Sequence, residues 1–111
     1  MALNKRTEFS DVDQEIASFS KAISHPARVA ILQYLAEQNS CFCGDIVEVL
    51  PLAQSTVSQH LKELQNAGLI KGEIEGPKTC YCIDTENYER LSNKLTGYLD
   101  KIIEVNKSTC C

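Results

Sequence analysis

The chain has 111 residues, of which 43% are hydrophobic and 23% charged, and it carries a formal net charge of −4. This length suits one domain with one core, and the composition excludes disordered and fibrous proteins. No apolar run approaches the roughly 18–20 residues that span a bilayer, and the first residues lack the apolar segment of a signal peptide. We therefore expect a cytoplasmic protein that does not associate with membranes.

The chain divides into an arm, a domain and a tail. Residues 1–9 are polar and unpatterned, which predicts a flexible arm, and residues 10–106 predict one domain before a cysteine-containing tail at 107–111. Ser10 is suited to cap a first helix, and Pro26 to begin a second. Apolar residues recur at helical spacing in five segments. These predicted helices cover about 10–23, 26–39, 45–50, 53–67 and 86–105.

Three shorter segments alternate like strands. Cys41-Phe-Cys43 precedes the third helix, while Leu69 to Glu75 and Lys78 to Ile83 flank Gly76-Pro77, a turn sequence that predicts a hairpin. Two short helices followed by a hairpin are the layout of a winged helix-turn-helix. The predicted fold is therefore α+β, mainly α, with five helices, a two-stranded wing and a short strand before the third helix.

The fourth predicted helix carries the candidate DNA-reading face. Its outward residues are short hydrogen-bonding side chains, which can reach base edges and phosphates in a major groove, whereas a merely solvated helix would more often alternate Glu and Lys. Only Glu63 interrupts this pattern. The predicted contacts are Gln54, Ser55, Thr56, Ser58, Gln59, His60 and Lys62.

The acidic net charge lowers the affinity for DNA that we expect, because neutralisation of phosphate charges by Lys and Arg supplies much of that affinity. Four acids, Glu8, Asp11, Asp13 and Glu15, lie in the region of the first helix, away from the reading face. Because the local distribution of charge matters more than its sum, we expect modest, salt-sensitive binding that needs two subunits.

Six runs of the sequence form a shared pattern. They are His25-Pro-Ala-Arg28-Val-Ala-Ile-Leu32, Gly44-Asp-Ile46, Gln54-Ser-Thr-Val-Ser-Gln-His-Leu-Lys62, Ala67-Gly-Leu-Ile70, Gly76-Pro and Tyr81-Cys-Ile83. These runs resemble the ArsR/SmtB family of bacterial winged-helix repressors, and the resemblance covers residues 12 to about 105. It implies a homodimer built largely from the first and last helices, which binds double-stranded operator DNA and leaves when an effector binds. It also implies a contact by Lys78 at the wing tip and contacts on the fourth helix by Ser55, Thr56, Ser58, Gln59, His60 and Lys62.

The six cysteines form three tight pairs, Cys41 with Cys43, Cys80 with Cys82, and Cys110 with Cys111. Close thiols favour soft ions or reversible oxidation, although small cysteines also fill cores. Aligned on the family pattern, the first pair falls one residue off the usual ligand positions. The two strand pairs bring four sulfurs together if they share a face, and a register slip of one residue separates them. The sequence leaves this open.

The tail pair, Cys110 and Cys111, has no core to fill, and it resembles the vicinal cysteines of some arsenic-responsive relatives. Trivalent arsenic takes three thiolates, so a third is needed, with Cys82 or Cys80 preferred to Cys41 or Cys43. We therefore predict a repressor without a permanent cofactor that trivalent arsenic or a related thiophilic ion releases from DNA. The alternative effector chemistry is oxidation or persulfidation of the paired thiols.

A thiol-dependent reductase is a weaker hypothesis. The chain has no phosphate-cradling loop beside a cysteine and no histidine spaced to activate one. We therefore predict that the protein is not an enzyme.

Overall fold

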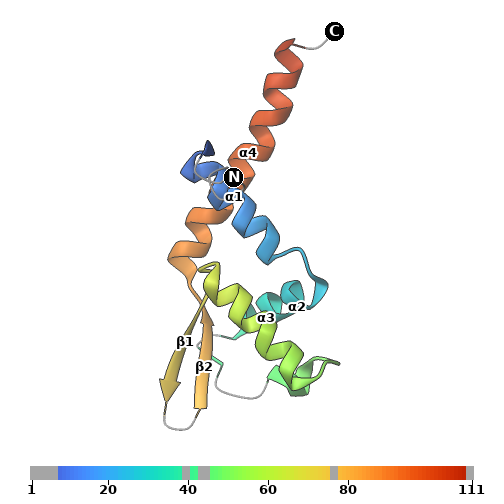
Figure 1. The fold of residues 1–111 in the computed structure, drawn as a ribbon, viewed down its shortest axis with the longest axis vertical. Helices are drawn as coiled ribbons and strands as arrows, with labels where there is room; N and C mark the ends of the chain where they lie inside the picture. The colour runs from blue at the N-terminus through green and yellow to red at the C-terminus, as the bar shows by residue number, and fades with distance from the viewer. Residues whose placement is uncertain (1–7, 39–40, 43–45, 76–77, 110–111) are drawn as a thin grey trace.

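The computed structural model describes residues 8–38, 41–42, 46–75 and 78–109. Helix α4 extends away from a body that contains α2, α3 and the hairpin, and α1 lies beside α4 (Figure 1). The elements in chain order are α1 (Asp11–Ala22), α2 (Pro26–Glu37), the 3₁₀ turn η3 (Ile46–Val49), α3 (Gln54–Asn66), β1 (Ile70–Glu75), β2 (Lys78–Ile83) and α4 (Thr85–Thr109).

The predicted winged helix-turn-helix is confirmed, with four α-helices rather than five in the described ranges of the chain. The third expected helix is only the 3₁₀ turn η3 among the described residues. Pro51 explains this, because proline disfavours helical dihedrals in the residue before it and leaves no room for a second turn. The short strand expected before this turn is a single antiparallel bridge between Phe42 and Tyr81 in the described residues.

Local signals in the sequence set the helix ends. The hydroxyl of Ser10 accepts a hydrogen bond from the Asp13 N–H at 3.1 Å, and Nδ1 of His25 accepts one from the Ala27 N–H at 3.0 Å. Both side chains therefore cap the helix that follows them. After α3, Gly68 adopts a φ of 82°, which turns the chain directly into the wing. Helix α4 continues to Thr109, three residues past the predicted domain end at 106.

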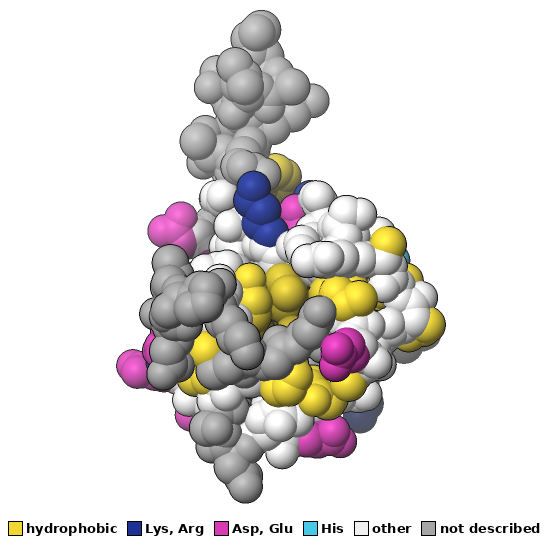
Figure 2. Space-filling model, turned by 90° about the horizontal axis from the view of Figure 1, so that it is seen from below, with side chains coloured by type: hydrophobic (Ala, Val, Ile, Leu, Met, Phe, Trp, Pro, Cys, Tyr) yellow, Lys and Arg dark blue, Asp and Glu magenta, His cyan; other side chains and the backbone are white. Residues whose placement is uncertain are grey.

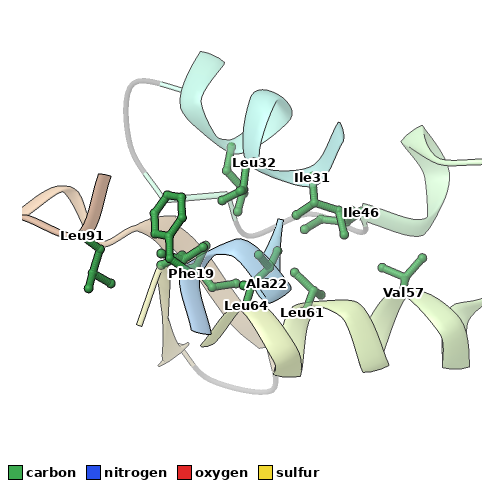
Figure 3. Packing of buried hydrophobic residues seen from close by; sticks show 12 residues of the cluster. Phe19, Ala22, Ile31, Leu32, Ile46, Val57, Leu61, Leu64 and Leu91 are labelled. Atoms are coloured by element: carbon green, nitrogen blue, oxygen red, sulfur yellow. The ribbon is translucent and has the colours of Figure 1, made fainter. Parts of the chain in front are cut away.

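Apolar side chains from the helices, η3 and β1 meet in one core. Figure 3 shows those of α1 and α3 pointing toward α2 and η3, so that the helix-turn-helix is fixed against the first helix. The buried cluster consists of Phe19, Ala22, Ile31, Leu32, Leu35, Ile46, Val57, Leu61, Leu64, Leu69, Ile70 and Leu91.

The beginning of α4 is fastened to α1, but its second half extends beyond the body. The Glu15 carboxylate accepts hydrogen bonds from Lys94 and Arg90, and these two interactions lower the pKa of Glu15. Further along α4, large apolar side chains are exposed, namely Tyr98, Leu99, Ile102, Ile103 and Val105. None of the helices within the described ranges has the length and hydropathy that crossing a membrane requires.

Candidate nucleic-acid interface and thiol site

Helix α3 presents a polar face to solvent. Val57, Leu61 and Leu64 face the core, and no acidic residue stands in the first turn of the helix. Its positive N-terminal end is therefore free of competing negative charge. Six predicted contacts are exposed on this helix: Gln54, Ser55, Thr56, Ser58, Gln59 and Lys62.

His60 corrects the sequence prediction, because it does not face outward. Its side chain is only 6% exposed, and its Nδ1 accepts a hydrogen bond from Nε of Arg28 at 3.1 Å. The sequence held a signal that we missed: position 60 lies three residues after Val57 and four before Leu64, on the edge of the buried stripe. His60 packs between α3 and α2 rather than on the reading face.

The environment of His60 favours its neutral form. Burial lowers the pKa of His60, and the charges of His25 and Arg28 lower it further, while Glu63 acts in the opposite direction. The ring of His25 lies 4.4 Å from that of His60, measured between centroids. Nε2 of His60 is buried without a hydrogen-bond partner among the described residues.

The wing is a two-stranded antiparallel hairpin. Strand β1 pairs with β2 from Ile70 opposite Ile83 to Glu75 opposite Lys78. Lys78 is thus the first residue of β2, at the tip of the wing, while its side chain lies outside the described part.

The end of the molecule that carries the wing tip is not strongly basic. Figure 2 views this end, where hydrophobic side chains gather near the centre and acidic side chains lie along the left edge and right of the centre. Few Lys or Arg side chains appear among the described residues on this face. The described residues on this face therefore offer few cations to neutralise phosphate.

A second site lies where the segment before η3 meets the wing. The Phe42 N–H donates to the Tyr81 carbonyl at 2.7 Å, and the Tyr81 N–H donates back to the Phe42 carbonyl at 2.9 Å. This pairing puts Cys41 opposite Cys82, with their Cα atoms 4.3 Å apart and their sulfurs joined in a disulfide.

The register that the sequence left open is therefore set for Cys41 and Cys82, which share a face. Cys80, two residues earlier on the same strand, is 2% exposed and is also disulfide-bonded. Cys43 and the predicted tail ligands Cys110 and Cys111 lie outside the described residues.

The joined sulfurs are accessible to small molecules. Cys41 and Cys82 are half-buried and border a cavity of about 770 Å³ that Leu32 and Tyr88 also line. A carboxylate oxygen of the exposed Glu73 and both sulfurs lie within 4.8 Å of one another. Two sulfurs and one carboxylate can hold a soft ion when the sulfurs are reduced, and the sulfurs alone can store two electrons.

A helix pair with a polar outer face, followed by a β-hairpin, defines a winged helix-turn-helix DNA-binding protein. The solved homodimeric winged helix-turn-helix domain of Mb0332 from Mycobacterium bovis, described as a possible ArsR-family transcriptional regulator, superposes with a TM-score of 0.63 at 26% identity, covering 86% of this chain and 92% of that one. A family profile described as "Bacterial regulatory protein, arsR family" matches residues 25–71.

Two relatives narrow the class. The uncharacterized HTH-type transcriptional regulator MJ1325 of Methanocaldococcus jannaschii is 39% identical over 70 residues, which cover 63% of this chain and 79% of the relative. The arsenical resistance operon repressor of Staphylococcus xylosus is 29% identical over 82 residues, which cover 74% and 78%. The chain belongs to the ArsR family, and it is a transcriptional regulator rather than an enzyme.

Proposed function

We propose that this chain is a homodimeric repressor whose hold on operator DNA is controlled by the thiols of Cys41 and Cys82. One observation carries the proposal: these two cysteines are bonded to each other across the junction between the helix-turn-helix and the wing. In a cytoplasm that keeps thiols reduced, such a bond is typically transient and serves catalysis or sensing. An effector that acts on this pair acts between the two DNA-binding elements.

The proposed trigger is a two-electron oxidation. One thiolate attacks a peroxide and becomes a sulfenic acid, releasing hydroxide, and the second thiolate attacks that sulfur, releasing a second hydroxide as the disulfide forms. A polysulfide reaches the same disulfide: one thiolate takes a sulfur atom from it, leaving the polysulfide one sulfur shorter, and the second thiolate attacks the resulting persulfide and releases hydrosulfide. The paired backbones of Phe42 and Tyr81 hold the two sulfurs ready for the second step.

The disulfide fixes the wing relative to the helix-turn-helix. Before oxidation, two backbone hydrogen bonds join Phe42 to Tyr81, and these bonds can open and close. After oxidation, a covalent bond prevents the wing from adjusting to the DNA backbone while α3 occupies the major groove. We assign the reduced protein to the operator-bound state and the oxidised protein to the released state.

The DNA contacts that we propose combine the face of α3 with the wing tip. Exposure of short polar side chains supports the α3 contacts, and the position of Lys78 at the end of the hairpin supports a contact with the minor groove or backbone. The contacts are Gln54, Ser55, Thr56, Ser58, Gln59, Lys62 and Lys78.

The dimer that we propose uses α1 and α4. Val12 and Phe9 are exposed near the start of α1, and the second half of α4 carries large apolar side chains that are about half exposed, namely Leu99, Ile102 and Ile103. A second copy would cover them, and the solved Mb0332 domain is homodimeric. Two copies also double the cations that face the DNA.

Trivalent arsenic, or a related thiophilic ion, is the second candidate effector. It would bind the same sulfurs in their reduced state, and the position of Glu73 beside them favours a cation there. Similarity to an arsenical resistance operon repressor supports this candidate. Arsenic requires a third thiolate, and the sequence offers Cys80, Cys43 and the tail pair Cys110 and Cys111.

Fluorescence anisotropy on an operator duplex, selected from random DNA by the reduced protein, tests the proposal. Hydrogen peroxide should release the wild type but not Cys82→Ser, and the matched variant Cys110→Ser/Cys111→Ser should still be released. Peroxide release that survives Cys82→Ser would overturn the thiol switch. Arsenite at a low molar excess over the protein tests the second candidate. Release of the tail variant but not of Cys82→Ser would place the ion at the strand cysteines. Release of Cys82→Ser but not of the tail variant would place it at the tail cysteines.

A further inference from the structure

Arg28 joins three helices through one guanidinium group. Its Nε donates to Nδ1 of His60 on α3 at 3.1 Å, and its Nη1 donates to the carbonyls of Lys21 and Ala22 at 3.2 and 3.4 Å. Those carbonyls belong to the last turn of α1, where a cation is also favoured by the helix dipole. Arg28 itself lies in the first turn of α2. The side chain therefore links the end of α1 to the DNA-reading helix.

The bond between Arg28 and His60 exists only while the His60 ring is neutral. Nδ1 accepts the hydrogen bond, so the single ring proton of the neutral form belongs on Nε2. A second proton would have to occupy Nδ1, the atom that already faces the Arg28 N–H. Protonation therefore replaces the hydrogen bond with a repulsion between two cations.

The ionisable groups that shift the pKa of His60 come from the turn before α2, from α2 and from α3 itself. His25, from the turn between α1 and α2, and Arg28, from α2, lower the pKa of His60, as burial does, while Glu63, one turn further along α3, raises it. The contacts of Arg28 with α1 are made through backbone carbonyls. The neutral ring is thus the form that the folded protein stabilises near neutral pH.

We propose that Arg28 and His60 are positioning residues for operator binding, which transmit the placement of α1 to the DNA-reading helix. His60 is buried and cannot itself read a base, but Gln59 and Lys62 lie on the same stretch of α3 and are exposed. A shift of the ring displaces those side chains. Because α1 is assigned to the dimer contact, this inference rests on the proposed function, and it explains how subunit arrangement reaches the reading face.

Operator affinity should consequently fall in mild acid. Because its pKa is lowered, the buried His60 ring takes up a proton less readily while it is hydrogen-bonded to Arg28, in the DNA-competent arrangement, than when that hydrogen bond is broken. Acidification from pH 7.5 through the ordinary value of about 6.5 therefore favours arrangements in which the link to Arg28 is broken. The effect is absent above that range, where the ring is neutral in both arrangements.

The test compares reduced wild type with Arg28→Ala, Arg28→Lys, His60→Asn and the double variant Arg28→Ala/His60→Asn, by operator anisotropy from pH 7.5 to 5.5. Asn keeps an acceptor near the position of Nδ1 and does not titrate. We expect Arg28→Ala to weaken binding about tenfold at pH 7.5, and His60→Asn to flatten the pH profile while retaining most affinity. The double variant should bind no more weakly than Arg28→Ala alone, because the two groups act as one link.

Melting temperatures and one control keep these outcomes separate from misfolding. Arg90→Ala removes an exposed arginine that pairs with Glu15 and should leave the pH profile of the wild type unchanged. If Arg28→Ala does not fold, Arg28→Lys replaces it in the comparison. Lysine retains the positive charge but lacks the guanidinium group that reaches both His60 and the carbonyls at the end of α1. Full additivity of the two substitutions, or a wild-type pH profile in His60→Asn, would overturn the inference. Failure of wild type to bind any duplex at pH 7.5 would instead overturn the proposed function.

Discussion

In a Cys80→Ser background, which removes the second disulfide on this strand, loss of the bond between Cys41 and Cys82 should lower the unfolding free energy of the oxidised protein by about 4 kcal/mol. The two residues are 41 positions apart in the chain. Closing a loop of that length removes about 13 cal/mol/K of entropy from the unfolded chain, which is about 4 kcal/mol at 25 °C. The variant Cys82→Ser loses this term and keeps the backbone pairing of Phe42 with Tyr81.

Urea denaturation measures the effect directly, at one fixed chain concentration because dimer stability depends on it. Oxidised Cys80→Ser should unfold at a midpoint about 2 M above that of oxidised Cys80→Ser/Cys82→Ser, if the urea dependence is about 2 kcal/mol/M. Thr79→Ser, on the same strand and exposed, is the matched control when added to Cys80→Ser and should leave its midpoint unchanged. Oxidant that stabilises Cys80→Ser/Cys82→Ser as much as Cys80→Ser would refute the prediction, since the responsible bond would then lie elsewhere.

Three further predictions concern the turn, the dimer and the reading face. Gly68→Ala should destabilise the fold by about 1–3 kcal/mol in thermal melts, because φ is 82° and the added Cβ would clash with the side-chain amide of Asn87; an unchanged melt would contradict this. Leu99→Glu or Ile102→Glu should produce monomers in sedimentation experiments, and a dimer that survives both charges would place the interface elsewhere. Gln59→Ala should weaken operator binding about tenfold with an unchanged melt, whereas full affinity would remove Gln59 from the proposed contacts.

Much of the fold could be predicted because local rules decide it. Ser10 caps α1 and Pro26 takes the first turn of α2, both as the side-chain chemistry of these residues predicts. The position of Gly76-Pro77 between two alternating runs predicted the hairpin that β1 and β2 form. These features depend on residues only a few positions apart.

The remaining features depend on contacts between distant segments. Whether Cys41 faces Cys82 depends on a backbone pairing 39 residues apart, between Phe42 and Tyr81, which no local pattern encodes. Helical spacing puts His60 at the edge of the buried stripe, but its polar partner inside the helix pair is Arg28, which is 32 positions away in the chain. Side-chain polarity alone therefore placed His60 on the wrong face.

In the proposed switch, the bond between Cys41 and Cys82 distinguishes the released protein from the DNA-bound protein. The most direct test is a peroxide titration of the protein on operator DNA. An alkylating reagent traps the thiols of the DNA-bound and released fractions, and peptide mass mapping then identifies the state of both cysteines in each fraction. We predict the peptide pair joined through Cys41 and Cys82 in the released fraction, and alkylated thiols at both positions in the bound fraction. A released fraction in which both cysteines are alkylated would contradict the account.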